Sequence, residues 1–172
     1  MLDLKSHLKY ILIAILTILV QVLIFNNVKL FDWLNPLVYS FFVFIFPIRN
    51  RSTILIYAFL IGLSIDYFTS TQGLNAFALT FLAFVREPIW RWFGFIRDEN
   101  NIVSKGHVSV IPYFFSIFLM ILIHHILIFG IERARGFDMD LILKTLLSSV
   151  VSFVVIVLFY IIFRVKLING EE

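Results

Sequence analysis

The sequence predicts an all-α protein, a helical bundle that crosses a membrane about six times. Of its 172 residues, 61% are hydrophobic and 21 are phenylalanine, a composition far from that of a soluble domain. Apolar runs recur along the whole chain with short polar connections between them. The length suits about six helices of ~20 residues, so we expect a single transmembrane domain over residues 1–172.

The first two apolar runs differ in length. Residues 8–25 are long enough to span a bilayer, and no small-residue cleavage site follows, which predicts an uncleaved helix and not a signal peptide. Pro36 then opens a run over residues 36–48, at a helix position where its missing N–H is harmless. As a helix this run reaches only about 20 Å, which is short for a bilayer.

The middle of the chain predicts a helical hairpin followed by an interfacial segment. The run over residues 53–68 leads into a polar bend, and the run over residues 74–85 ends at a charged cluster that includes Pro88. Residues 89–95, IWRWFGF, alternate tryptophan and arginine as segments at a membrane surface do.

Two long runs, residues 108–130 and 141–163, follow a polar loop over residues 98–106 and complete the predicted six spans.

The distribution of lysine and arginine predicts the orientation, because cytoplasmic loops hold the excess of positive charge. With the N-terminus inside, the outer loops hold only Lys29, Arg133 and Arg135, and Lys144 lies within the last run. The inner segments hold all the others: Lys5, Lys9, Arg49, Arg51, Arg86, Arg91, Arg97, Lys105, Arg164 and Lys166. We expect both termini in the cytoplasm, and this basic face gives no reason to expect a nucleic-acid partner.

Asp66 is an acid between two apolar runs, where a carboxylate is costly. One interpretation is a hairpin clasp, in which Asp66 accepts hydrogen bonds from the unsatisfied N–H groups that begin the next helix. Gly73 would supply a turn conformation that other residues disfavour. Further capping would come from Thr69, Ser70, Thr71 and Asn75. The alternative, compatible with the first, makes Asp66 a wall of a ligand or partner site, and only that role depends on its charge.

Small residues indicate close helix packing in the bundle interior. Ala58 and Gly62 lie four residues apart on one face of the third run. Similar faces are formed by Ala76 and Ala83 in the fourth run and by Ser148, Ser149 and Ser152 in the sixth.

Polar residues in the last two runs form a possible cluster. His124 and His125 point about 100° apart on a helix, which disfavours joint metal binding, and one of them is expected to hydrogen-bond the serine face of the sixth run. A proton relay is the alternative. Lys144 is expected to extend its ammonium group to the membrane surface, although pairing with Asp66 would complete a cluster with His124, His125 and Ser148.

Catalysis is not expected. The chain has no cysteine, no paired carboxylates within a span, no nucleophile elbow and no phosphate-binding glycine loop. We predict no enzymatic activity, no cofactor and no metal site.

The string GLSIDYFTSTQGLNAFALTFLAFVRE resembles the signature of the rod shape-determining protein MreD family. The matching positions are a glycine, an aspartate four residues on, a polar turn with a second glycine, and a small-residue span that ends near an arginine. In this chain they are Gly62, Asp66, Gly73, Leu74, Asn75, Ala76 and Arg86.

The resemblance implies a non-enzymatic scaffold in the bacterial cytoplasmic membrane that acts in peptidoglycan synthesis and helps maintain rod shape. The implied partners are an MreC-like protein and, further out, MreB, RodA and a class B penicillin-binding protein, besides membrane lipids. The family is also similar in fold to the substrate-binding subunits of energy-coupling-factor transporters. A solute-binding subunit for a vitamin or other small molecule is therefore the alternative function.

Overall fold

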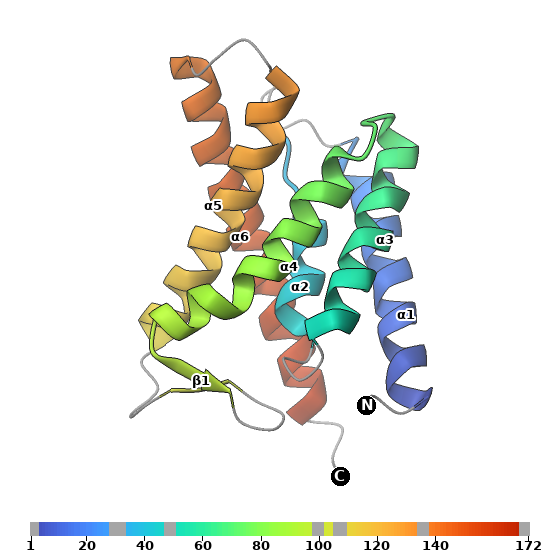
Figure 1. Cartoon of the computed structure of the whole chain (residues 1–172), viewed down its shortest axis with the longest axis vertical. Coiled ribbons are helices and arrows are strands. Elements are labelled where there is room, and N and C mark those ends of the chain that lie inside the picture. The colour runs from blue at the N-terminus through green and yellow to red at the C-terminus, as the bar shows by residue number, and fades with distance from the viewer. Residues whose placement is uncertain are drawn as a thin grey trace.

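The computed structural model describes residues 4–27, 34–46, 51–97, 102–104, 110–133 and 138–168. Within these ranges the chain forms a helical bundle with one short β-ribbon (Figure 1). Its helices are α1 (Leu4–Val20), continued by the π-helical turn η1 (Gln21–Phe25), the 3-10 turn η2 (Val38–Ser40), α2 (Phe41–Ile45), α3 (Arg51–Thr69), α4 (Leu74–Trp92), α5 (Val110–Arg133) and α6 (Met139–Ile168).

Two antiparallel helix pairs frame the bundle. α3 packs closely on α4, α5 packs on α6, and α4 joins the pairs through its contacts with α5. α1 flanks α3, and the short α2 lies among the longer helices (Figure 1). The start of α1 and the end of α6 lie at one end of the bundle, while the bend between α3 and α4 lies at the other.

Four helical segments among the described residues are long and apolar enough to cross a membrane: His7–Phe25, Arg51–Thr69, Ile111–Arg133 and Met139–Phe159. They indicate a membrane protein. α2 is too short to qualify, and α4 carries charged residues near its end, among them Arg86, Glu87 and Arg91. All six predicted runs contain described helix, but only four of the described helices have the length and composition of a span.

The core lies around α2, whose side chains from Phe41 to Phe44 are all buried. Aromatic rings of Phe42, Phe46 and Tyr57 meet within 6 Å of one another, at centroid distances of 5.4–5.7 Å. Many large aliphatic side chains of α1 and α6 are instead exposed, as expected for helices whose outer faces contact lipid.

The second run differs from its prediction, because Pro36 does not open the helix. Residues 35–37 are not helical, and the helical residues begin at Val38 and end at Ile45. Side chains from other helices bind the backbone N–H groups of this stretch, so it does not need helical hydrogen bonds. The predicted last residues of the run, 47 and 48, lie outside the described residues.

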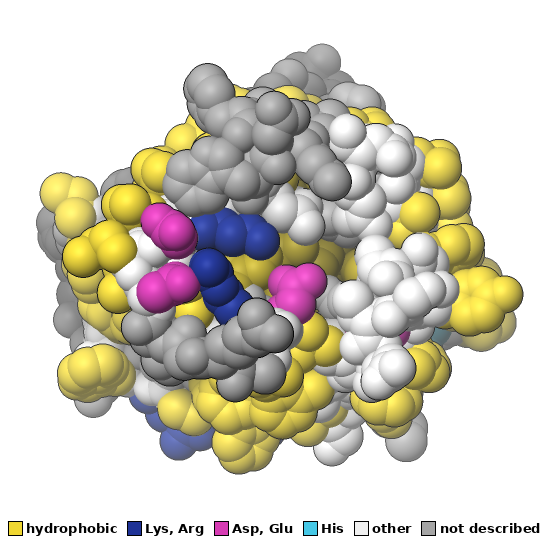
Figure 2. Space-filling model, turned by 90° about the horizontal axis from the view of Figure 1, so that it is seen from above, with side chains coloured by type: hydrophobic (Ala, Val, Ile, Leu, Met, Phe, Trp, Pro, Cys, Tyr) yellow, Lys and Arg dark blue, Asp and Glu magenta, His cyan; other side chains and the backbone are white. Residues whose placement is uncertain are grey.

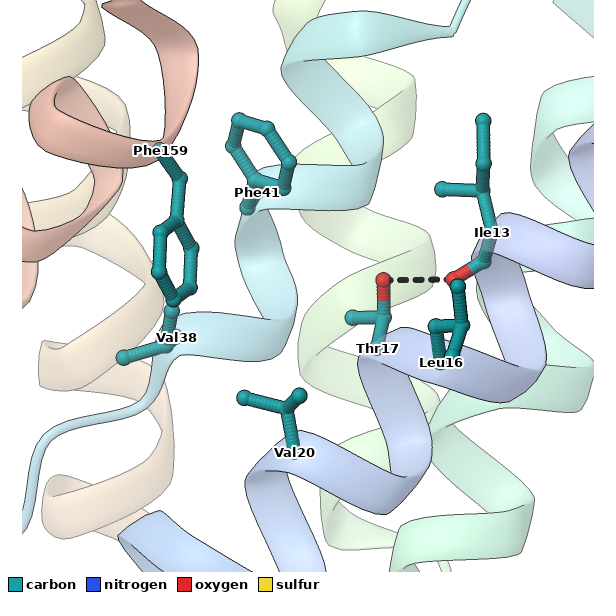
Figure 3. A pocket seen from close by; sticks show the side chains of 7 residues that line it. All are labelled: Ile13, Leu16, Thr17, Val20, Val38, Phe41 and Phe159. Carbon is teal, nitrogen blue, oxygen red and sulfur yellow. Dashed lines mark hydrogen bonds between the residues drawn. The ribbon is translucent and has the colours of Figure 1, made fainter. Parts of the chain in front are cut away.

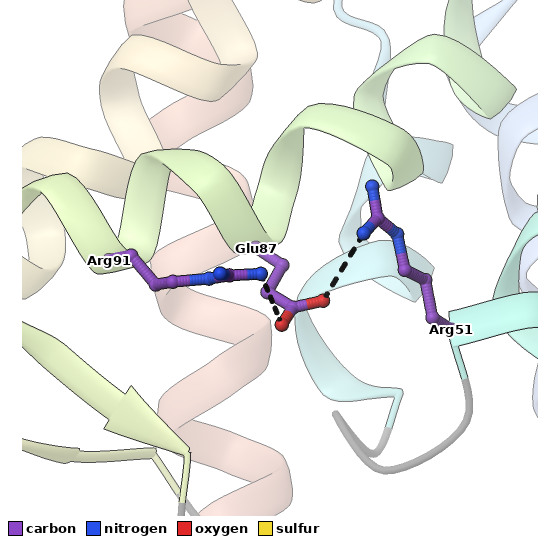
Figure 4. A network of polar contacts seen from close by, with 3 residues as sticks. All are labelled: Arg51, Glu87 and Arg91. Atoms are coloured by element: carbon purple, nitrogen blue, oxygen red, sulfur yellow. Dashed lines mark hydrogen bonds and ion pairs between the residues drawn. The ribbon is translucent and has the colours of Figure 1, made fainter.

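The prediction that the fourth run ends before Pro88 is wrong, because α4 continues through Pro88 to Trp92. An internal proline costs a helix about 3 kcal/mol. The burial of Trp90, which is 3% exposed, offsets part of this cost. Glu87 also forms partly exposed ion pairs with Arg91 of the same helix at 2.8 Å and with Arg51 of α3 at 3.9 Å (Figure 4), and each contributes at most about 1 kcal/mol.

The predicted polar loop, residues 98–106, holds the second strand of a small antiparallel ribbon whose first strand begins in the predicted interfacial segment. Gly94, at φ +81°, ends the helical direction of α4, and β1 (Phe95–Arg97) then pairs with β2 (Ile102–Ser104). The other residues of the predicted loop, 98–101 and 105–106, lie outside the described part of the chain. Of the predicted interfacial segment, Trp92 is 81% exposed, whereas Trp90 packs inside the bundle.

Candidate functional site

Asp66 fastens α3 to the start of α4. Its carboxylate is 5% exposed, and its Oδ2 atom accepts a hydrogen bond from the Ala76 N–H at 2.8 Å. Oδ1 accepts bonds from the Asn75 N–H at 2.9 Å, the Asn75 side-chain amide at 3.0 Å and the Thr71 hydroxyl at 2.5 Å. The residue thus caps the N-terminus of α4 from a different helix, which satisfies orphan donors and places negative charge at the positive end of the helix dipole. The predicted clasp by Asp66 is confirmed, but the predicted cap by Thr69 is not, because its hydroxyl bonds to the Ile65 carbonyl oxygen of its own helix and contacts Thr71.

The bend itself has an uncommon backbone. Gly73 adopts φ +92°, as predicted for this turn, and Ser70 and Gln72 also have positive φ values of 58° and 52°. The Thr71 hydroxyl contacts both Asp66 and the Asn75 side-chain amide, which holds the bend against the carboxylate. Three left-handed residues within four positions shorten the connection, so that the end of α3 and the start of α4 stay close.

Gly62 lets the two helix backbones touch. A Cβ atom at this position would lie 2.4 Å from the Ala76 Cα and 2.6 Å from both the Ala76 N and the Asn75 O. No side chain fits at such distances. Ala58 and Ala83 are also buried, so the predicted small-residue packing of α3 and α4 is confirmed.

Asn75 links this joint to the centre of the bundle. Its side-chain oxygen accepts a 2.6 Å hydrogen bond from the Tyr39 hydroxyl, and Tyr39 is 1% exposed. The Tyr39 ring meets the ring of His124 edge-on, at a centroid distance of 5.1 Å. A continuous series of buried polar side chains therefore runs from the bend, through η2, to α5.

His125 makes the predicted contact with the serine face of α6. Its Nε2 atom lies 3.1 Å from the Ser152 hydroxyl, and its Nδ1 atom lies 2.9 Å from the Ile121 carbonyl oxygen. His124 is equally buried, but neither of its ring nitrogens has a hydrogen-bond partner among the described residues. The two neighbouring histidines thus have different roles, one bonded on both sides and one in ring contact only.

Serines of α6 and a glutamine of α1 hold the non-helical stretch before η2. The Ser152 hydroxyl accepts a bond from the Leu37 N–H at 3.0 Å, and the Ser148 hydroxyl accepts one from the Asn35 N–H at 3.3 Å. The Gln21 side-chain oxygen accepts bonds from the N–H groups of Val38 and Tyr39 at 2.8 and 3.2 Å. Irregular backbone persists at membrane depth only where protein satisfies it in this manner.

Lys144 does not join the predicted cluster through an ion pair with Asp66. Its ammonium nitrogen lies 4.5 Å from the centre of the Phe129 ring, a cation–π contact. The carboxylate of Asp66 is occupied by donors of the bend and of α4. The possible cluster is therefore divided: Ser148 holds Asn35, His125 contacts Ser152, and Lys144 packs against α5.

Arg86 caps α2 from the second half of α4. Its Nη1 atom donates to the carbonyl oxygens of Val43 at 2.5 Å and Phe46 at 2.9 Å, while the guanidinium lies 5.0 Å from the Trp90 ring centre. The cation also opposes the negative end of the short helix. The arginine of the sequence motif thus acts on a third helix, and the motif fixes the positions of α2, α3 and α4 together.

The end of the bundle that carries the bend has two different halves. Figure 2 shows charged side chains gathered on one side of this end, where α5 ends and α6 begins, and uncharged polar surface on the other. The charged half includes exposed Glu132, Arg133, Asp138 and Asp140, with an ion pair of 2.9 Å between Arg133 and Asp138. Among the described residues of this half, three acids therefore stand against one arginine.

Sequence reasoning missed Gln21 and Tyr39, and it predicted a histidine contact for the serine face of α6 but not the bonds of Ser148 and Ser152 to the backbone before η2. A buried glutamine in an apolar run was a usable signal, because polar side chains inside spans have partners. Tyr39 carried no signal, since tyrosine is frequent in membrane helices. Within the described ranges, no group of three or more His, Cys, Asp or Glu side chains is placed to hold a metal ion.

These residues make a joint that positions helices and presents surfaces. The Ser152 hydroxyl lies 3.1 Å from His125 Nε2, but both side chains are fully buried and the hydroxyl also accepts the Leu37 N–H, so this pair holds backbone in place. No protein-family model, curated protein or solved structure matches this chain.

Proposed function

We propose that the protein is a non-enzymatic scaffold of the MreD type, which binds an MreC-like protein in the bacterial cytoplasmic membrane. On this proposal it crosses the membrane about six times, keeps both termini in the cytoplasm and supports rod shape through control of peptidoglycan synthesis. MreB, RodA and a class B penicillin-binding protein are its further partners.

One observation carries the proposal: the residues of the signature act together in a single buried joint. Gly62, Asp66, Gly73, Asn75 and Ala76 bring two helices into backbone contact at the bend, and Arg86 extends the joint to α2. Such a joint stabilises one arrangement of helices, which is what a docking surface for another membrane protein requires.

The first test is co-purification and cell shape. A tagged full-length chain is expected to retain an MreC-like protein, and its depletion is expected to make rod-shaped cells round. The paired variants Asp66→Asn and Asp66→Leu separate a clasp from a charge-dependent contact. Full function in the asparagine variant with loss in the leucine variant supports the clasp alone. Loss in both, with the asparagine variant folded, assigns the charge to the partner contact.

The alternative function predicts a different result. A solute-binding subunit would retain a vitamin-like ligand through purification and would need an ATPase module for activity. Retention of such a ligand, without an MreC-like partner and without any change in cell shape on depletion, would replace the scaffold proposal.

The proposed orientation has its own test, because the chain has no native cysteine. A single cysteine at Gln72, which is exposed at the bend, is expected to react with an impermeant thiol reagent from outside. A cysteine at Ser104, in β2, is expected to react only after the membrane is opened. The reverse labelling would overturn the orientation.

A further inference from the structure

An apolar groove opens between α1 and the α2–α6 side of the bundle (Figure 3). It has a volume of about 250 Å³. α1 contributes Ile13, Leu16, Thr17 and Val20 to one wall, and the opposite wall is formed by Val38, Phe41 and Phe159. The hydroxyl of Thr17, the one polar group on these side chains, donates a 2.8 Å hydrogen bond to the Ile13 carbonyl oxygen. The groove therefore presents no unsatisfied side-chain polar group to an occupant and has no need of water.

The groove opens on a surface suited to hydrocarbon. Leu16 on its edge is 48% exposed, and neighbouring exposed side chains of α1 and α6 include Leu12, Leu19 and Leu158. An occupant that enters sideways from the bilayer never leaves an apolar environment. An acyl chain meets this condition, whereas a polar solute does not.

A lysine lies on the face of α1 that lines the groove, near the start of the helix. Lys9, Ile13 and Thr17 are spaced four residues apart and so lie above one another on one helix face. Lys9 is exposed, and Lys5 continues the exposed basic surface one turn further toward the helix start. A molecule with an apolar tail in the groove would place its other end beside these two positive charges.

The length of this helix face matches one leaflet. At ~1.5 Å per residue, Lys9 and Val20 are separated by about 16 Å along the axis of α1. The hydrocarbon of one leaflet is about 15 Å thick, half of a ~30 Å bilayer core. A phospholipid with its phosphate at Lys9 therefore has a chain of the right length to reach the far end of the groove.

We propose that this groove is a binding site for an anionic phospholipid of the leaflet that meets the N-terminal end of α1. One acyl chain lies between α1 and Phe159, and the anionic headgroup lies at Lys9 and Lys5. The site is independent of the proposed scaffold function, since it uses none of the residues of the joint at Asp66.

Native mass spectrometry of the full chain tests this site. The protein is released from mixed micelles that contain phosphatidylglycerol and phosphatidylcholine with identical acyl chains. The wild type is expected to retain one phosphatidylglycerol in preference to phosphatidylcholine. Lys9→Gln is expected to lower this preference about fivefold, the factor given by ~1 kcal/mol for one lysine near an anionic surface. Lys144→Gln removes the same charge near the other end of the bundle and should leave the preference unchanged.

A second pair of variants tests the groove itself. Val20→Phe adds a ring to the α1 wall of the groove, and loss of the retained lipid, whatever its headgroup, is expected. Leu19→Phe adds a ring on the neighbouring exposed position and should retain the lipid as the wild type does. Equal retention of both lipids by the wild type, or full retention by Val20→Phe, would overturn the proposal. A lipid-free dimer that Val20→Phe abolishes would assign the groove to a second copy of the chain.

Discussion

The backbones of Gly62 and Ala76 are in direct contact. A Cβ atom added at Gly62 would lie only 2.4 Å from the Ala76 Cα. Gly62→Ala is therefore expected to push α3 and α4 apart and to lower stability by about 1–3 kcal/mol, as overpacking does. The apparent melting temperature in detergent micelles measures this loss. Adding Ala76→Gly should not restore stability, because the clash involves backbone atoms. Rescue by that second change would show that the helices meet in another way.

Substitutions of Asp66 should destabilise the bend, and the loss should grow with the number of acceptors removed. Asparagine keeps an oxygen for Thr71 and Asn75 but turns its amide toward the Ala76 N–H, which loses its acceptor. We expect a loss of about 1–3 kcal/mol for Asp66→Asn and a larger loss for Asp66→Leu, which removes every acceptor. Thermal unfolding in micelles measures both. Equal stability of the two variants would contradict the cap.

Two buried serines of α6 offer a matched comparison. Ser152 accepts the Leu37 N–H and contacts His125, whereas Ser149 bonds only to the Thr145 carbonyl oxygen of its own helix. Ser152→Ala leaves a buried N–H without a partner and should cost about 1–3 kcal/mol. Ser149→Ala should cost clearly less. Thermal unfolding in micelles measures both variants. If both unfold at the same temperature, Ser152 does not hold the stretch before η2.

Substitution of the two neighbouring histidines is expected to affect stability differently. His125→Phe removes hydrogen bonds to Ile121 and Ser152 and should lower the melting temperature. His124→Phe replaces a buried ring, whose nitrogens have no partner among the described residues, with an apolar ring of similar shape. Its stability should be unchanged or higher. A stable His124→Phe variant that fails to support cell shape would give His124 a role in function.

Arg86 should control the order of α2. Arg86→Met keeps much of the side-chain volume but leaves the carbonyls of Val43 and Phe46 without their cap. Arg86→Lys restores the charge without the planar guanidinium. Hydrogen exchange of residues 41–46 is expected to be fastest in the methionine variant, intermediate in the lysine variant and slowest in the wild type. Identical exchange rates in all three proteins would show that α2 is stable without the Arg86 cap.

The sequence predicted best those features whose partners are close along the chain. The cap by Asp66 joins residues at most ten positions apart, and a carboxylate before a helix start has few other uses in lipid. Gly73 was predictable for the same reason, since a tight bend needs a positive φ.

Features fixed by distant contacts were not predictable in the same way. Pro88 is a helix breaker by local rules, but Trp90 is buried in the bundle, and Glu87 pairs with Arg51 of α3. The break before η2 depends on Gln21 and on two serines that lie more than a hundred residues away. The sequence shows that these polar residues are present, but it does not show which backbone groups they hydrogen-bond.

The distance along the chain between Leu37 and Ser152 also has a consequence for synthesis. Their hydrogen bond spans 115 positions, so the hydroxyl that this N–H requires is made only when translation of the last helix is well advanced. Until then the Leu37 N–H lacks its acceptor from α6, and water or another protein has to satisfy it. A chain that lacks α6 is therefore expected to keep this N–H without its acceptor, even when its earlier helices have formed.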